Sequence, residues 1–260
     1  DRLRSRGLGD VYKRQIYIRY RIVVQPGRTL RSGRRGRWFE SSQSDQPYLP
    51  FAAGIFLSAA KGNGTATRDQ KMKDIINDRC GWAGTDELYI RYHDEEWGRQ
   101  VTSDQVLFEF LLLESAQAGL SWITILRKRE GYKKAFHHFD AVKVAQMTAE
   151  DVERLMKFDG IVRNRLKIAG AINNAKCFLA VQKEFGSFYQ YVVSFLPGGR
   201  PIVNRFTVLS EIPASSPESD ALSKDMKKRG FKFFGSTICY AFLQATGFVD
   251  DHLEGCFCKK

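Results

Sequence analysis

One carboxylate, Glu114, stands in an otherwise apolar part of the sequence and is the first residue whose setting indicates chemistry. Leu111–Leu113 come directly before it, and no Lys or Arg lies beside it. If Glu114 is buried without a partner, its charged form is disfavoured and its pKa rises. Groups of this kind concentrate at functional sites. Alternatively, Glu114 faces solvent or caps a neighbouring backbone group, and the stretch alone leaves both interpretations open.

Aromatic residues are concentrated on both sides of Glu114. Four of them lie within sixteen residues and a fifth follows the apolar stretch: Trp82, Tyr89, Tyr92, Trp97 and Trp122. Aromatic faces of this kind form the walls of sites that stack a flat ring. The competing interpretation is that these rings belong to an ordinary hydrophobic core.

Two pairs of Cys and His stand at opposite ends of the region 72–260. His93 lies thirteen residues after Cys80, and Cys256 lies four residues after His252. Two thiolates and two imidazoles are the ligand set of a closed tetrahedral zinc site, which leaves no position for a reacting water. Such a site would be structural and would join the two ends of the region. The spacing also permits Cys258 in place of Cys256, or ordinary thiols and surface histidines.

A Gly turn between two predicted helices, within 155–168, indicates a phosphate site. The turn contains Gly160, and Arg163, Arg165 and Lys167 follow it. The N-terminus of a helix after such a turn exposes free N–H groups to a phosphate, and basic side chains add the salt-sensitive attraction that dominates DNA binding. An ordinary turn between two helices, with a solvated basic face, is the alternative.

The elements that position these residues are predicted to be helices. Thr102 or Ser103 caps a helix that ends near Ala118, before Gly119, and Ser121 begins the next one. Further helices are predicted at 149–157, 163–179, 187–195, 220–229 and 236–246, with a Pro- and Ser-rich loop at 212–219. Because strand-like alternation is scarce, the fold class is predicted to be all-α.

The composition indicates a globular protein with reduced cysteines and no membrane span. Hydrophobic residues make up 43% and aromatic residues 13% of the 260 residues, enough for a substantial core. The five cysteines are irregularly spaced, which is not the pattern of a disulfide framework. Charged residues interrupt the apolar stretches well before the roughly 18 residues that a membrane helix needs.

The excess of basic charge belongs almost entirely to residues 1–71. This segment has 15 Lys or Arg against 5 Asp or Glu, whereas residues 72–260 have 26 against 24. It contains no Met and has no sustained periodicity, so it is predicted to be a basic leader that is disordered or not native. An Arg-rich targeting leader and a basic arm for nucleic acid are the alternatives. Residues 72–260 are the predicted folded domain.

Several blocks between Met72 and Cys258 resemble the 3-methyladenine-DNA glycosylase I family, within the helix-hairpin-helix DNA glycosylase superfamily. They are Arg79-Cys-Gly-Trp, Leu88-Tyr-Ile, Tyr92-His-Asp-Glu-Glu-Trp-Gly, Gln117-Ala-Gly-Leu-Ser-Trp-Ile-Thr, Leu209-Ser-Glu-Ile-Pro, Asp220-Ala-Leu-Ser-Lys, Lys227-Lys-Arg-Gly-Phe-Lys-Phe and Thr237-Ile-Cys-Tyr. The resemblance implies a helix-hairpin-helix glycosylase fold whose structural zinc joins the N- and C-terminal segments of 72–260. It implies a monofunctional enzyme of base excision repair that flips 3-methyladenine out of double-stranded DNA and hydrolyses its N-glycosidic bond.

The resemblance also implies a role for each candidate residue. The zinc ligands would be Cys80, His93, His252 and Cys256, with Cys256 preferred to Cys258. The DNA-clamping hairpin would be Gly160, Ile161, Val162 and Arg163, with Arg165 and Lys167 beside it. Glu114 would contact the base, between walls formed by Trp82, Tyr89, Tyr92, Trp97 and Trp122. A cytoplasmic, nucleoid-associated monomer is expected, or a protein of an organelle or nucleus if the leader is genuine.

The implied substrate changes the role expected of Glu114. Methylation at N3 makes the adenine ring cationic and therefore a good leaving group that needs little acid assistance. An ionised Glu114 then discriminates in favour of the cationic ring, which the aromatic faces stack. Leu120 is the expected side chain that fills the vacated base stack. A helical DNA-binding module without catalysis, and a glycosylase with a wider range of substrates, are the alternative functions.

Overall fold

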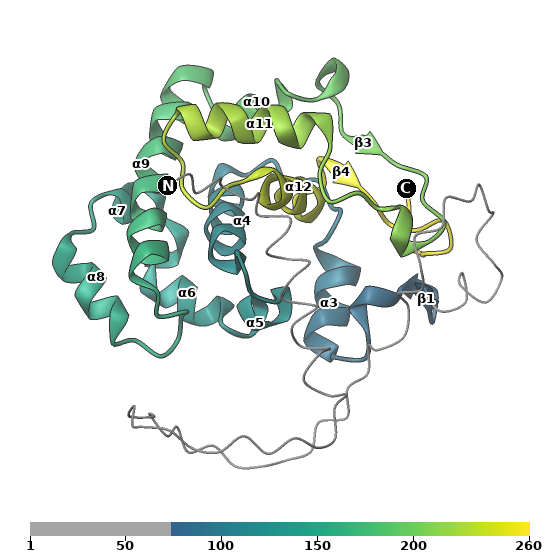
Figure 1. The fold of residues 1–260 in the computed structure, drawn as a ribbon, viewed down its shortest axis with the longest axis horizontal. Coiled ribbons are helices and arrows are strands. Elements are labelled where there is room, and N and C mark those ends of the chain that lie inside the picture. The colour runs from purple at the N-terminus through teal and green to yellow at the C-terminus, as the bar shows by residue number, and fades with distance from the viewer. Residues whose placement is uncertain (1–73) are drawn as a thin grey trace, which may run out of the picture. The chain divides into compact units, whose positions relative to one another are not determined.

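The computed structural model describes residues 74–260 and consists mainly of α-helices (Figure 1). The predicted all-α class is confirmed for these residues. Their β-structure is limited to two short pairs: β1 (Ile75–Ile76) is antiparallel to β2 (Arg79–Cys80), and β3 (Ile202–Val203) is parallel to β4 (Val249–Asp250). The predicted basic leader at 1–71 lies outside the described residues.

The central helix is α4 (Asp104–Gln117), which contacts α5 (Trp122–Arg127), α9 (Arg165–Phe185), α10 (Phe188–Val193) and α12 (Ser236–Ala245) (Figure 1). A helix that is apolar on nearly all sides must be buried, and residues 110–116 of α4 are all buried. The helix follows Ser103 and ends before Gly119, whose φ is +80°. Both predicted ends are therefore confirmed to within two residues.

The longest helix, α9, packs against α4 and α10. It starts two residues later than predicted because Asn164 is its N-cap and accepts a hydrogen bond from the Lys167 N–H at 3.1 Å. It continues to Gly186, which has a φ of +82° and ends the helix. Phe178 joins the neighbouring helices, because its ring centroid lies 5.1 Å from that of Phe108 and 4.3 Å from that of Phe188.

Helix α11 (Pro217–Lys228) corrects one predicted boundary. The Pro- and Ser-rich segment was predicted to be a loop as far as residue 219, but the helix begins at Pro217. Ser216 caps it by accepting the Ser219 N–H at 3.2 Å, and Pro is well suited to the first helical position. By contrast, the predicted start of α8 (Ala149–Met156) is confirmed, with the Asp151 carboxylate accepting the Thr148 N–H at 2.9 Å.

Three helices were not predicted: α3 (Glu87–Glu95), α6 (Arg129–Ala135) and α7 (Ala141–Ala145). Each is short, and tertiary contacts rather than periodicity specify helices of this length. Short 3₁₀ segments occupy Gly81–Ala83, His137–Phe139, Pro197–Gly199 and Leu209–Glu211. Among the described residues, none of the helices combines the length and apolar character needed to cross a membrane.

Candidate functional site

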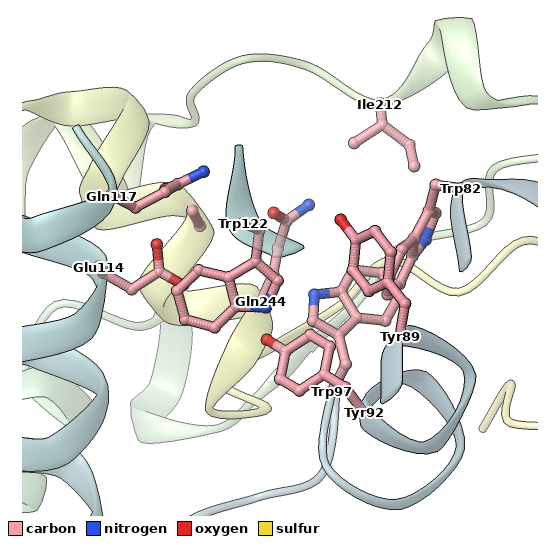
Figure 2. Close-up of a pocket in the computed structure, with 10 residues that line it drawn as sticks. Trp82, Tyr89, Tyr92, Trp97, Glu114, Gln117, Trp122, Ile212 and Gln244 are labelled. Atoms are coloured by element: carbon pink, nitrogen blue, oxygen red, sulfur yellow. The ribbon is translucent and has the colours of Figure 1, made fainter. Parts of the chain in front are cut away.

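A cavity of about 220 Å³ opens beside the C-terminal half of α4 (Figure 2). Its lining includes every predicted wall residue and Glu114; the complete set is Trp82, Tyr89, Tyr92, Trp97, Glu114, Gln117, Trp122, Ile212, Ala241 and Gln244. Pockets for drug-sized ligands span roughly 300–1,000 Å³. The smaller volume and the aromatic lining suit one flat ring system.

The aromatic rings of the cavity orient one another through edge contacts. The Trp82 ring centroid lies 5.1 Å from that of Tyr89 and 4.9 Å from that of Trp97, with interplanar angles of 61° and 70°. Tyr92 and Trp122 lie 5.5 Å apart at 53°. Tyr89 and Tyr92 share a face of α3 because they are three residues apart. This arrangement keeps the rings in place before any ligand enters.

Glu114 is buried, so the structure decides between the two locations that the sequence left open. Its exposed fraction is 3%, and its Oε2 atom has no hydrogen-bond partner among the described residues. Desolvation raises the pKa of this carboxyl from its usual 4.5 to about 8. Figure 2 shows the carboxylate extending from α4 towards Trp122 and the cavity. A cation entering the cavity would restore the charged form of Glu114.

Two more buried polar atoms of the cavity have no partner among the described residues. They are the amide oxygen Oε1 of Gln117 and the indole nitrogen Nε1 of Trp122. A buried polar atom without a partner costs about 1–3 kcal/mol. With Glu114, these atoms belong to three residues that line one small cavity.

A buried carboxylate, Asp251, fixes the far wall of the cavity. It accepts hydrogen bonds from Tyr240 Oη at 2.6 Å, Gln244 Nε2 at 2.7 Å and Asn204 Nδ2 at 2.7 Å. Gln244 is thereby held in the cavity lining. The sequence reasoning missed Gln244 and Gln117, although the three-residue spacing from Glu114 was an available signal for Gln117.

The buried Glu114 should make the protein less stable as pH rises. The pKa of Glu114 is raised to about 8 in the folded state. The protonated carboxyl therefore stabilises the folded state fully below about pH 4.5, and this stabilisation is lost as pH rises towards 8. We expect Glu114→Gln to remove this loss, which amounts to a few kcal/mol. Urea unfolding of the wild type and the variant at pH 5 and pH 8.5 measures this loss of unfolding free energy. Parallel pH dependences in the two proteins would contradict a buried, unpaired carboxyl.

The predicted Gly turn joins α8 to α9 and packs directly on α6. A Cβ atom on Gly131 of α6 would lie 2.0 Å from the carbonyl oxygen of Gly160. The next residue, Tyr132, accepts a hydrogen bond at its Oη from the Val162 N–H at 3.2 Å. The close approach therefore requires glycine at position 131, and α6 supports the hairpin from behind.

The predicted DNA-contacting residues fall into two groups, of which the first is available to a ligand. Arg163 and Arg165 are exposed. Arg163 pairs with Asp159 at 2.9 Å, and Arg165 pairs with Glu153. Exposed ion pairs of this kind are weak, so a phosphate can displace the carboxylate. Leu120 is half-buried, in the loop between α4 and α5.

The second group corrects the sequence-based prediction. The Ile161 side chain is 2% exposed and belongs to the core. The Lys167 ammonium donates hydrogen bonds to the carbonyl oxygens of Ala116 at 2.8 Å and Ala118 at 2.6 Å. Lys167 therefore satisfies the free C-terminal carbonyls of α4 rather than facing a phosphate. It connects the hairpin helix to the helix that carries Glu114.

Five possible metal ligands lie together near the C-terminus. The donor atoms of His93, His252, Cys256 and Cys258 all lie within 4.8 Å of one another. Cys80 is adjacent, because its thiol hydrogen-bonds to Cys256; this contact lowers the pKa of the Cys256 thiol and raises that of Cys80. All four predicted ligands are therefore brought together. The structure also keeps Cys258 as a candidate, which the family resemblance had set aside.

Neighbouring carboxylates orient the two imidazoles in this cluster. The Nδ1 atom of His93 lies 2.8 Å from Asp94 Oδ1, and that of His252 lies 2.8 Å from Asp250 Oδ1. Each Nε2 atom therefore faces the cluster: that of His93 lies 3.4 Å from Cys256 Sγ, and that of His252 is buried without a partner. Carboxylates commonly orient the imidazoles that bind zinc. The donor set fits tetrahedral zinc.

The mainly helical fold holds a buried carboxylate within an aromatic cavity, beside a helical hairpin. The chain belongs to the methyladenine glycosylase family, whose model matches residues 82–259. It is therefore an enzyme that acts on N-glycosyl bonds. The resemblance inferred from the sequence blocks is confirmed.

The chain is similar to bacterial proteins that are named as DNA-3-methyladenine glycosylases. The chain is 55% identical over 181 residues to DNA-3-methyladenine glycosylase 1 of Escherichia coli K12, covering 70% of this chain and 96% of the relative. A crystal structure of a 3-methyladenine DNA glycosylase I superposes with a TM-score of 0.68 at 52% identity, covering 70% of this chain and all of the other. The Staphylococcus aureus enzyme, whose structure addresses 3-methyladenine recognition, is 40% identical with a TM-score of 0.68; 70% of this chain and 97% of that one are covered.

Proposed function

We propose that this protein excises 3-methyladenine from alkylated double-stranded DNA as a monofunctional glycosylase of base excision repair. The observation that carries the proposal is Glu114, a buried and unpaired carboxylate in a cavity walled by aromatic rings. Such a site favours a flat cation over a neutral ring. The names of the relatives, including 3-methyladenine recognition by the S. aureus enzyme, support this choice of base.

The proposed reaction requires little acid catalysis. As the C1′–N9 bond breaks, its electron pair passes to the cationic base, which leaves as neutral 3-methyladenine. Water then adds to C1′ of the oxocarbenium-like sugar and releases a proton. The sequence 163–185, from the hairpin to the end of α9, contains no Asp that could assist as a base. The enzyme contributes mainly by selecting and orienting the base.

The hairpin and the loop before α5 would hold the DNA around the extruded nucleotide. Arg163 and Arg165 are exposed at the hairpin and would contact phosphates. Removing a base from the stack leaves a gap that apolar side chains commonly fill. Leu120 lies two residues before Trp122, which lines the cavity, and this proximity supports Leu120 as the side chain that would fill the gap.

Leu120→Ala is therefore expected to weaken binding to damaged duplex DNA about 10-fold, because the unstacked gap stays unfilled. Binding of free 3-methyladenine should be nearly unchanged, because the base cavity is intact. Fluorescence anisotropy with DNA and calorimetry with the free base give the two affinities. Equal losses in both assays would be inconsistent with a role in the vacated stack.

We further propose that the Cys and His cluster holds one structural zinc. Cys80, His93, His252 and Cys256 are the proposed ligands, and a four-ligand site provides cross-linking rather than catalysis. The ion would join the segment around β2 to the segment after β4, which are far apart in the sequence.

The proposed partner is double-stranded DNA, bound by a monomer.

The direct test is a base-release assay on methylated DNA with identification of the products. We expect 3-methyladenine to be the main product, with little 7-methylguanine and no hypoxanthine from deaminated DNA. Comparable release of all three bases would instead indicate a glycosylase of wider range. Binding to DNA without release of any base would contradict the proposed activity.

A further inference from the structure

The ammonium group of Lys167 joins the helical hairpin to the loop between α4 and α5. Lys167 lies in the first turn of α9, where its main-chain N–H donates to the N-cap Asn164 at 3.1 Å. Its Nζ atom donates hydrogen bonds to the carbonyl oxygens of Ala116 at 2.8 Å and Ala118 at 2.6 Å. The first carbonyl belongs to the last turn of α4, and the second begins the loop 118–121. One side chain therefore connects two elements that are 49 residues apart in the sequence.

The setting of Lys167 is that of a fixed connection and not of a surface lysine. An ordinary surface lysine keeps its ammonium in water, whereas Lys167 is half-buried and desolvation lowers its pKa. Hydrogen bonds from a charged donor are roughly twice as strong as neutral ones, and a cation is stabilising at the C-terminal end of a helix. Figure 1 shows α9 beside α4, and Lys167, Ala116 and Val162 of the hairpin line the same narrow gap.

The loop that Lys167 holds lies next to the base cavity. Gly119 has a φ of +80°, and the Leu120 N–H donates to the carbonyl oxygen of Gln117 at 2.6 Å. Trp122, which lines the cavity, follows directly after the loop. The position of Leu120 is therefore determined by the end of α4 on one side and by the ammonium of Lys167 on the other.

We propose that Lys167 is a positioning residue that sets Leu120 at a fixed distance from the hairpin. The proposal rests on the proposed excision reaction and on Leu120 as the side chain that fills the vacated stack. The hairpin would hold phosphates of the DNA, and Leu120 would enter the gap only where the loop is in register with those phosphates. A misplacement of about 1 Å can cost on the order of 100-fold in rate. Lys167 would thus act on the DNA without touching it.

The test measures the preference for a duplex with one tetrahydrofuran abasic-site analogue over the matched intact duplex. Fluorescence anisotropy gives both affinities, and calorimetry gives the affinity for free 3-methyladenine. We expect Lys167→Met, which keeps the apolar stem but has no donor, to lower the preference about 10-fold, the effect of one hydrogen bond to a charged group. The affinities for the intact duplex and the free base should be nearly unchanged.

Two further variants of Lys167 make the test independent of the folding of one protein. Lys167→Gln has a shorter, neutral side chain that does not reach α4, so it should lose the preference as Lys167→Met does. Lys167→Arg keeps a charged donor on a long stem and should retain most of the preference. Melting curves for all variants give the temperature below which the affinities are compared.

Arg165→Met is the matched control, because Arg165 lies in the same turn of α9. This side chain is exposed and pairs with Glu153. Replacing it removes a positive charge near the DNA without loosening the loop, so the affinities for the two duplexes should fall alike. A double-mutant cycle adds Leu120→Ala to each background. Leu120→Ala should cost less affinity for the abasic duplex in Lys167→Met than in the wild type, because the loosened loop no longer presents Leu120.

A lower melting temperature of Lys167→Met with an unchanged preference would mean that Lys167 only stabilises the fold, and would overturn the proposal. Equal costs of Leu120→Ala in the two backgrounds, or a wild type that binds the two duplexes equally, would also overturn it. If the wild type releases no 3-methyladenine but its preference depends on Lys167, the proposed activity fails and the positioning role stands. If the wild type releases 3-methyladenine and Lys167→Met keeps the preference, the positioning role alone fails.

Discussion

Glu114→Gln is expected to lower the release of 3-methyladenine from alkylated DNA about 100-fold. The substitution keeps the size and shape of the side chain but removes the charge that pairs with the cationic ring. A hydrogen bond to a charged group contributes about 1.5–3 kcal/mol, and the upper value corresponds to roughly 100-fold in rate. Single-turnover release from methylated DNA, with melting curves for both proteins, measures the effect. Unchanged release by a folded variant would reject a functional Glu114.

The pH profile distinguishes an ionised Glu114 from a general acid. Its pKa is raised to about 8 in the empty cavity, so the free enzyme holds the carboxyl mostly protonated at neutral pH. If the ionised form stabilises the cation, kcat/KM should rise with pH up to about 8 and then level. A general acid would show the opposite slope. The Glu114→Gln profile should be flat over this range, which separates Glu114 from the other titrating groups.

The sequence predicted the central part of the site because the signals there are local. Ser103 and Gly119 bound a helix whose apolar residues cover nearly every side, so burial was one of the two locations open to Glu114, and the structure confirms it. The five aromatic residues were also predicted correctly as walls of one cavity. In each case residue type and short-range spacing gave the role as one of two alternatives, and the family resemblance favoured it.

Other features depend on contacts that spacing alone does not reveal. Lys167 looked like a phosphate ligand in the sequence, but its long side chain reaches the end of α4 and binds the carbonyl of Ala118. Gln117 was not singled out as a site residue in the sequence, but it lines the cavity. Gly131 had no evident role until the structure placed it against Gly160. Lys167 and Gly131 are decided by partners at least 29 residues away in sequence, and Gln117 by the cavity.

His252→Ala is expected to abolish zinc binding and to lower the melting temperature by about 10 °C or more. Metal binding contributes directly to folding free energy, and about 1 kcal/mol corresponds to roughly 2–4 °C in a domain of this size. The expected fall therefore requires a loss of only a few kcal/mol. Metal analysis of the purified protein and calorimetric melting measure the two effects. Cys177→Ser is the matched control, because its half-buried thiol hydrogen-bonds to the Arg229 carbonyl outside the cluster.

Loss of the zinc ion should also disturb the base cavity, because two aromatic contacts connect the Cys and His cluster to the cavity wall. The His252 ring centroid lies 4.5 Å from that of Trp97, and the His93 ring centroid lies 5.2 Å from that of Trp82. Both tryptophans line the cavity, so releasing either imidazole frees a wall that stacks the base. We therefore expect His252→Ala to bind free 3-methyladenine more weakly even below its melting temperature. Full zinc content in this variant would contradict the proposed ligand, whereas zinc loss with unchanged base affinity would contradict only the coupling to the cavity.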